Sequence, residues 1–508
     1  MSIKCRTWRR LFGVLAGVLL SAAACVGAPY DLVPRGDWSY DLLARWAARG
    51  VLAKIEPSAG APPAFPSAAR AFHGDEPLTR AEMADIVLMI AERPEALPAG
   101  DEALLTHLLW EFSWEIQRAG RDPAALIRSL SAVKQPVIRG TGFGLARLGI
   151  TGGDTLRGVY RAAGVASVTS RLLTAISLTN ERQLFSTDPK AFPILENYVA
   201  RWHTGFAEWE LGKTGRRWGP GFGGTMLLSD NAPALFQLRG LKHLSFGFLG
   251  RDYTFEQFVA TLNETGGRRY IVARRLSRPF GRRAGVSISE AIKSASTRDW
   301  PLALFLPLYV YNHTVFSDEE KARTLNYLAG GDLWYAPSDA VRVYGDLVID
   351  DITAPFGLGY HVPRKIGYVL GLNLPHLNAR RTQVWLEWAL TDGEKPGSSL
   401  HEGGTYIHRN PTLSWYINDV PIGHPMGQNR RGPFVRVQHR FGRRFTAIGE
   451  WEDERLWRPT PVVGDWRRAT LYGAYDLRPD SSVALHLERR GGALGRDTLV
   501  ELQGAYSF

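Results

Sequence analysis

Cysteine and long apolar segments are scarce in this chain of 508 residues. Its only cysteines are Cys5 and Cys25, so the rest of the chain can form no internal disulfide and no cysteine metal cluster. Beyond the N-terminal segment, no apolar run reaches the length of about 18 residues that a membrane-spanning helix needs. Such a chain can cross a membrane only as a closed barrel, because every backbone N–H and C=O in lipid must be paired within the protein.

Motifs of catalytic and cofactor sites are absent as well. The sequence holds no Gly-x-Ser-x-Gly elbow, no His-Glu-x-x-His helix, no phosphate loop and no dinucleotide fingerprint. Its histidines are scattered without metal-ligand spacing, and we expect His408 and His424 to be hydrogen-bonding loop residues rather than bases. The sequence therefore predicts neither an enzyme nor a cofactor, although a barrel enzyme acting on lipid or glycan remains a third hypothesis.

Residues 1–28 are typical of a secretory signal peptide. A basic start precedes the short apolar run Leu11–Leu20, and small residues follow it. Attachment of a lipid to Cys25 is an alternative to simple cleavage. The formal net charge of +11 falls to +7 when the four cations of this segment are set aside. A secreted chain seldom meets nucleic acid, so nucleic acid is not an expected partner.

The last residues, Asp497–Phe508, alternate with a period of two. Apolar or aromatic residues recur on one face and end with Phe508, whereas Glu501 and Gln503 fall on the other face. This pattern is typical of the closing strand of an outer-membrane barrel, with a strand of a soluble sandwich as the alternative.

Period-two alternation also extends over most of the chain from about residue 140 onward. At roughly 20 residues per strand and connection, this region predicts on the order of 18 strands. A soluble propeller of that length would need a repeated blade motif, and the sequence has none. Turn signals occur at Arg478–Ser481 and Arg489–Gly492. Examples of the expected strands are Val168–Leu178, Arg201–Leu211, Leu302–Tyr311, Val341–Ile349, Arg381–Leu390, Phe445–Trp451 and Thr470–Leu477.

Arginines cluster in two stretches, Arg268–Arg283 and Arg430–Arg444. Guanidinium groups pair bidentately with phosphates and carboxylates, so lipopolysaccharide or an acidic polysaccharide is a possible partner. An ordinary charged lumen wall or rim is the alternative, since the inside of a barrel is normally polar.

Two helical segments precede the strands. The first has helical signals at Asp41–Gly50 and at Thr79–Glu82, where Thr79 and Glu82 form a capping box. Apolar residues at helical spacing predict further helices between Asp101 and Val133. The first segment resembles one S-layer homology (SLH) repeat, in its Val33–Asp41, Gly50–Leu52 and Pro77–Glu82 motifs. That resemblance implies binding of a cell-wall polymer through Trp38, Gly50 and Arg80, whereas simple helix packing and capping is the alternative.

The motif Gly215–Gly221, followed by Gly224–Pro233, has no role in an ordinary strand, because its glycines and prolines enforce a sharp path. It resembles the signature of the capsule-assembly (Wzi) family of outer-membrane proteins. Later segments of the chain agree in order and spacing, at Tyr344–Asp351, Ile366–Leu372, Tyr406–His408 and Tyr416–Gly427. The resemblance implies an outer-membrane barrel with a helical periplasmic part that binds polysaccharide without catalysis.

The candidate site residues from this motif are Arg217, Trp218, Asp230 and Asn231, which we expect to organise the lumen or to bind glycan. The predicted fold is mainly β, a transmembrane outer-membrane antiparallel barrel of about 18 strands behind a small α-helical periplasmic unit. We expect a signal peptide (1–28), an SLH-like helical domain (29–95), a helical segment (96–138) and the barrel (139–508). The main functional hypothesis is a binder of surface or capsular polysaccharide. The alternative is a porin-like barrel that tethers the outer membrane to the cell wall.

Overall fold

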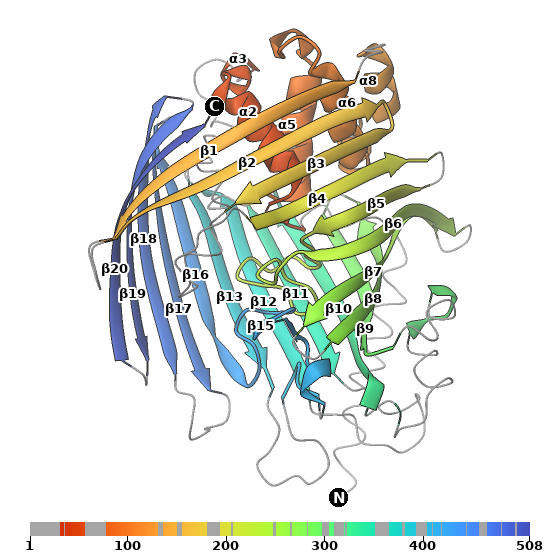
Figure 1. The fold of residues 1–508 in the computed structure, drawn as a ribbon, viewed down its shortest axis with the longest axis vertical. Coiled ribbons are helices and arrows are strands. Elements are labelled where there is room, and N and C mark those ends of the chain that lie inside the picture. Colours follow the sequence, from red (N-terminus) through yellow and green to blue (C-terminus); the bar gives the residue numbers. More distant parts are fainter. Residues whose placement is uncertain are drawn as a thin grey trace, which may run out of the picture.

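A closed antiparallel β-sheet surrounds the interior of the protein in a computed structural model (Figure 1). The structure describes residues 31–34, 36–55, 78–130, 136–149, 155–179, 194–204, 207–246, 250–264, 267–281, 283–296, 304–308, 320, 323–350, 365–377, 382–392, 404–408, 410–417, 419–442, 444–456, 465–478, 480–492 and 495–507. The predicted signal peptide and Cys25 lie outside these residues.

The sheet has 18 strands, each antiparallel to its neighbours in sequence, and β14 and β15 form a separate ribbon. The first strand pairs with the last, from Phe143 opposite Ser507 to Gly149 opposite Glu501, and this pairing closes the ring. The predicted barrel of about 18 strands is thereby confirmed. The strands are β1 Val137–Gly149, β2 Thr155–Thr169, β3 Leu172–Thr179, β4 Ile194–His203, β5 Glu208–Thr214, β6 Leu235–Phe246, β7 Gly250–Glu264, β8 Gly267–Phe280, β9 Ala284–Ser294, β10 Leu325–Ser338, β11 Val341–Asp350, β12 Ile366–His376, β13 Thr382–Thr391, β14 Tyr416–Ile417, β15 Val420–Pro421, β16 Arg430–Phe441, β17 Phe445–Leu456, β18 Trp466–Arg478, β19 Ser481–Gly492 and β20 Gly495–Ser507.

The strands carry apolar side chains outward and polar side chains inward. On β20, Leu502 is 48% exposed whereas Gln503 is 5% exposed, as the alternation of the C-terminal sequence predicts. On β13, Leu386 and Trp388 are exposed on either side of the buried Glu387. This distribution is the reverse of a soluble protein's and matches a wall that faces lipid outside and a polar lumen inside. The chain is therefore a transmembrane β-barrel.

The two ends of the barrel differ in their connections. One end has only short connections between strands, among them residues 170–171, 204–207, 247–249, 281–283, 339–340, 442–444 and 479–480. The other end has the long connections, which include residues 180–193, 215–234, 295–324, 351–365, 392–429 and 457–465. Barrels of the bacterial outer membrane have short periplasmic turns and longer extracellular loops.

The helices gather at the end with short connections, beside β1 to β4 (Figure 1). None of the helices in the described part of the chain is long and apolar enough to cross a membrane. With the segment 31–37 they form what is called the helical unit below. The helices are α2 Trp38–Ala48, α3 Val51–Ile55, α5 Arg80–Ala91, the 3₁₀ helix η1 Pro94–Ala96, α6 Glu102–Glu111, α7 Ser113–Arg118 and α8 Pro123–Ser129.

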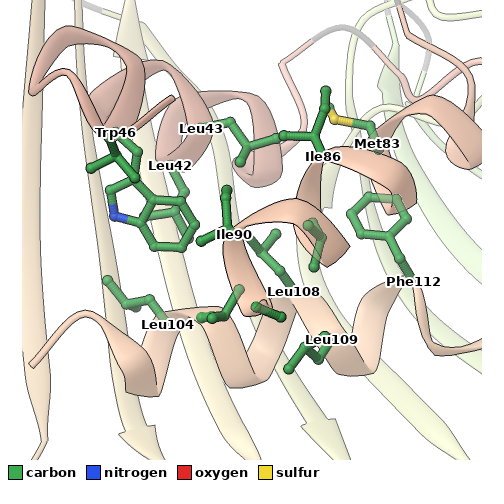
Figure 2. Packing of buried hydrophobic residues seen from close by; sticks show 14 of the residues in the cluster. Leu42, Leu43, Trp46, Met83, Ile86, Ile90, Leu104, Leu108, Leu109 and Phe112 are labelled. Carbon is green, nitrogen blue, oxygen red and sulfur yellow. The ribbon is translucent and has the colours of Figure 1, made fainter. Parts of the chain in front are cut away.

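Apolar stripes of the helices pack into one core (Figure 2). Trp46, Ile90 and Leu104 are completely buried between α2, α5 and α6, and the core continues onto inward residues of β1 to β4, such as Val137 and Val199. The predicted capping box is present, because Thr79 Oγ1 accepts from the N–H of Glu82 and the Glu82 carboxylate accepts from the N–H of Thr79. Helix α2 ends at Ala48, and Gly50, two residues later, has a φ of +74°, which a glycine after a helix adopts readily.

Some predicted strands are wrong in detail. The segments Val168–Leu178 and Arg201–Leu211 each contain a turn, at 170–171 and 204–207, because alternation can continue unchanged across a tight hairpin. The described part of Leu302–Tyr311, residues 304–308, contains helical turns and no strand. The turn predicted at Arg478–Ser481 is confirmed, whereas Arg489–Gly492 forms the end of β19.

Candidate functional site

The connection between β5 and β6, residues 215–234, folds back into the barrel and is called the first lumen loop. Arg217 organises it: its guanidinium pairs with the Asp230 carboxylate and donates to the carbonyl oxygens of Gly221 and Phe222, the latter at 2.9 Å. Gly219 has a φ of +125, and a Cβ there would lie 2.7 Å from the Asp346 carboxylate. The glycine-rich sequence is therefore needed for the close approach of this loop to the wall.

Carboxylates on the wall hold the loop by its backbone. Asp346 on β11 accepts from the N–H of Met226 at 2.7 Å, and Glu387 on β13 accepts from the N–H of Gly223 at 2.8 Å. Glu387 also accepts from the N–H of Phe222. Both carboxylates are buried on the inward face. The loop is thus fixed in the lumen rather than displayed at its rim.

A second lumen loop, whose described residues are 404–408, 410–417 and 419–427, packs onto the first. Trp415 donates from its indole to Leu227 O at 3.0 Å, and the Tyr406 hydroxyl donates to Met226 O at 2.6 Å. The side-chain amide of Asn231 donates to Pro421 O at 2.8 Å. Asp230 and Asn231, predicted from the sequence, therefore hold the first lumen loop to its own arginine and to the second loop.

The two loop histidines accept hydrogen bonds from the backbone. His424 Nδ1 accepts from the N–H of Met426 at 3.3 Å, and His408 Nδ1 accepts from the N–H of Asn410 at 3.1 Å. Burial, with a smaller contribution from the neighbouring Arg217, lowers the pKa of His424 to about 3. A neutral His424 is therefore the form that the folded loop requires.

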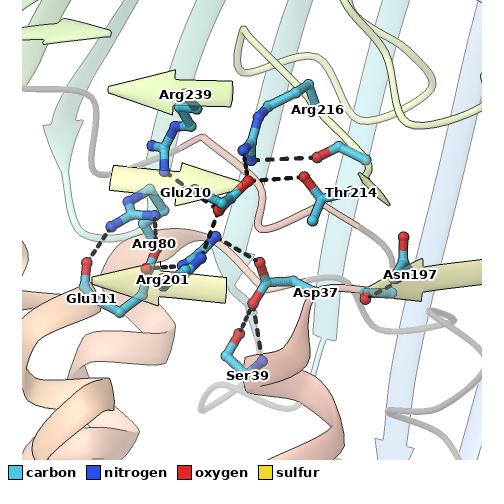
Figure 3. A network of polar contacts seen from close by, with 12 residues as sticks. Asp37, Ser39, Arg80, Glu111, Asn197, Arg201, Glu210, Thr214, Arg216 and Arg239 are labelled. Atoms are coloured by element: carbon cyan, nitrogen blue, oxygen red, sulfur yellow. Dashed lines mark hydrogen bonds and ion pairs between the residues drawn. The ribbon is translucent and has the colours of Figure 1, made fainter. Parts of the chain in front are cut away.

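The helical unit contacts the wall through ion pairs. In most of these pairs the acid lies on the unit and the arginine lies on a strand. Asp41 pairs with Arg161 at 3.0 Å, and Arg201 lies between Asp37, Glu111 and Glu210 (Figure 3). Further pairs at this interface are Asp101 with Arg139, Asp31 with Arg275, and Glu82 with Arg342.

A cavity of about 100 Å³ remains between the helical unit and the first lumen loop. Arg80 and Trp114 line it from the helical unit, Arg217 and Trp218 from the loop, and inward strand residues such as Glu256 complete it. The Trp218 indole donates to Glu256 at 3.1 Å and lies edge-on to Phe258. The cavity thus brings together Arg80, from the SLH-like motif, with Arg217 and Trp218, from the capsule-assembly-like motif.

The other predicted residues do not line this cavity. Trp38 is buried in the helical unit, with the Arg201 guanidinium 5.8 Å from its ring, and Gly50 follows helix α2. Arg80 is engaged within the protein by Glu111 at 2.9 Å and Glu115 at 2.7 Å. The binding of a wall polymer by Trp38, Gly50 and Arg80 stays a prediction.

The ion pairs of Arg80 determine the charge states of Arg80 and Glu111 between the helical unit and the wall. Burial alone would lower the pKa of Arg80, but Glu115 and Glu111 outweigh burial and raise it. Burial alone would raise the pKa of Glu111, but Arg201 and Arg80 together lower it to about 2. Both groups are therefore charged at neutral pH, and their charges are balanced inside the protein.

Sequence reasoning missed Trp114, Arg201, Arg239 and Glu256 as site residues. Three of them lie on the inward face of strands, where alternation places polar residues, but nothing in the sequence separates them from the rest of the lumen wall. Among the residues that the structure describes, no cluster of three histidine, cysteine or acidic side chains could hold a metal ion.

The fold resembles solved outer-membrane barrels. The chain matches no protein-family model and no curated sequence. It is similar to Wzi of Escherichia coli, an outer-membrane protein involved in group 1 capsule assembly and described as a carbohydrate-binding β-barrel. The identity is 14%, the match covers 94% of this chain and 99% of that chain, and the TM-score is 0.57. OccK1 (OpdK) of Pseudomonas aeruginosa matches at 9% identity over 73% of this chain and 97% of its own, with a TM-score of 0.43. At these identities the likeness shows the fold alone.

Proposed function

We propose that this chain is an outer-membrane β-barrel that binds surface or capsular polysaccharide and assists its assembly or retention, without catalysing a reaction. By the rule of short periplasmic turns, the helical unit faces the periplasm and the long connections face the cell exterior. The outward apolar face contacts the lipid and lipopolysaccharide of that membrane.

The observation that carries this proposal is the occupied lumen. Two loops lie in it and bind carboxylates of the wall, and the helical unit packs against β1 to β4 at the end with short connections. A diffusion channel needs a continuous water-filled passage, whereas a binding protein can use the lumen to build rigid sites. The ordered motifs of the capsule-assembly family and the fold shared with a carbohydrate-binding barrel support the same function.

The porin-like tether has less support from the geometry. It would need Trp38 and Arg80 to be available to a wall polymer, but Trp38 is buried and Arg80 is paired with two carboxylates. One arginine of each cluster has a partner inside the barrel, since Arg275 pairs with Asp332 and Arg436 with Glu450. These side chains contribute to the lumen wall.

A deletion strain, stained for cell-bound and shed polysaccharide, tests the proposal. We expect more shed and less cell-bound polysaccharide than in the parent strain, with restoration by the intact gene. Unchanged retention would contradict the proposal. Planar-bilayer recordings of the purified barrel separate the alternative, because a large steady conductance would favour the porin.

A further inference from the structure

The cavity between the helical unit and the first lumen loop is large enough for a small ligand. Its volume is about 100 Å³. Roughly 10–15 Å³ of such space admits one water, so the cavity is several times larger than a single water requires and can take a small ligand.

The cavity's charges are already paired. Its lining contains six arginines, and each lies within 4.0 Å of at least one carboxylate. They are Arg80, Arg201, Arg216, Arg217, Arg239 and Arg275. An anionic sugar would need a guanidinium without a carboxylate partner, because its own carboxylate would otherwise compete with an acid of the protein. This lining therefore disfavours a uronate or a phosphate.

The same pairs suit neutral hydroxyl groups. A hydroxyl both donates and accepts, and an arginine–carboxylate pair offers one partner of each kind side by side. Arg239 and Glu256, 2.6 Å apart, and Arg80 and Glu115, 2.7 Å apart, present such pairs from two sides of the cavity. Ligand sites commonly combine a few converging polar groups of this kind with aromatic surfaces.

Two indoles supply the aromatic surface. Trp218 is held by its hydrogen bond to Glu256, and Trp114 stacks on His243 with ring centroids 4.8 Å apart. Trp114 Nε1 is buried and has no hydrogen-bond partner among the described residues. The C–H faces of a sugar pack on such rings.

The cavity extends toward the end with short connections, where Glu208, His243 and Thr254 line it. His243 lies on the same inward face of β6 as Leu241 and Arg239. Its side chain is exposed. It stands near the short turn between β6 and β7, whereas the first lumen loop covers the cavity on the opposite side.

We infer that this cavity binds one neutral sugar residue, which reaches it from the helical end of the barrel. The inference rests on the proposed glycan-binding function and narrows it to one site, one ligand class and one side of the membrane.

The test uses the full chain in detergent and saturation-transfer NMR with free glucose, galactose and mannose and the corresponding uronates. We expect at least one neutral hexose to bind more tightly than its uronate. Trp114→Leu should weaken that binding about tenfold, the equivalent of ~1.4 kcal/mol for a lost aromatic contact. Thr254→Trp, which fills the cavity from β7, should abolish it.

Trp110→Leu is the matched control. Trp110 is half-buried like Trp114 and also stacks on an inward histidine, His203, at 5.4 Å, but it does not line the cavity. The inference is overturned if no hexose binds, if a uronate binds more tightly, or if both cavity variants leave hexose binding unchanged.

Pull-down of purified envelope polysaccharide separates this inference from the proposed function. If the wild type and both cavity variants capture polysaccharide equally, the cavity is not the site but the function stands. If the wild type captures none, the proposed function fails as well.

Discussion

The helical unit and the lumen loops occupy the same barrel but are attached to it in opposite ways. The unit brings its own acids to arginines on the wall, as Asp41 does to Arg161 and Glu111 to Arg201. The loops bring backbone N–H groups to acids on the wall, as Met226 does to Asp346. Ion pairs between side chains tie particular residues together, whereas backbone hydrogen bonds fix the path of the chain itself.

The two kinds of attachment, ion pairs and backbone hydrogen bonds, predict different losses of stability when one partner is removed. Removing one partner of a buried ion pair leaves an uncompensated charge, which is costly because water cannot reach it. Removing an acceptor from a backbone N–H leaves a neutral donor unpaired, at a smaller cost and within one loop.

The largest effect is expected for Arg201→Met. This change leaves Glu111, Glu210 and Asp37 without their shared cation and should lower the free energy of unfolding by about 3–5 kcal/mol. Thermal unfolding in detergent measures it. Arg121→Met is the control, because the Arg121 side chain is 56% exposed in its pair with Glu92 and should cost below about 1 kcal/mol. Equal effects of the two changes would refute the importance of the buried network.

A smaller and local effect is expected for Asp346→Val. The N–H of Met226 then lacks its acceptor, which should destabilise the first lumen loop by about 1–3 kcal/mol. Hydrogen exchange followed by mass spectrometry should show faster exchange in residues 222–228 and little change in the helical unit. Glu501→Gln, a change to a wall carboxylate that bonds His486 at 3.1 Å, serves as control. Faster exchange throughout the helical unit would contradict the separation of the two attachments.

The smallest effect is expected from acid acting on His424. Its pKa is about 3 in the folded loop against an ordinary 6.5, so the unfolded loop binds the proton first. The stability that depends on neutral His424 is complete above pH 6.5 and declines as the pH falls toward 3. The loss should be about 1.4 kcal/mol at pH 5.5. Hydrogen exchange of the loops, corrected for the intrinsic pH dependence, measures it, and His424→Asn should remove the effect. A loop equally sensitive to acid in that variant would exclude His424 as the cause.

The wall of the barrel was predictable from the sequence, since alternation alone places Leu502 outward and Gln503 inward. The expected loop at Gly215–Gly221 was also correct, because glycine and proline exclude a strand there. The prediction of a strand at Leu302–Tyr311 failed in its described residues, 304–308, for a physical reason. Leu308 is buried against Leu325 and Tyr327, which lie on the outward face of β10, and an apolar segment that packs on this face has the same composition as a strand.

The cavity could not be predicted. It joins Arg80 to Glu256, residues far apart in sequence, and their meeting depends on strand register and on how deeply the loop enters the lumen. Neither quantity is encoded in a local pattern. The sequence supplied Arg217 and Trp218 through a motif, but it gave no reason to connect them with Arg80.

The seam between β1 and β20 has a consequence for biogenesis. Since Gly149 faces Glu501 across it, the cylinder cannot shut until nearly the whole polypeptide has been delivered to the bilayer. The segment carrying Asp31 is synthesised first, yet its partner Arg275 follows 244 residues later. The sheet must therefore close around the helical unit, which is synthesised before the strands. A truncation that removes only the final strand would leave two unpaired edges in the membrane and should stall at that stage.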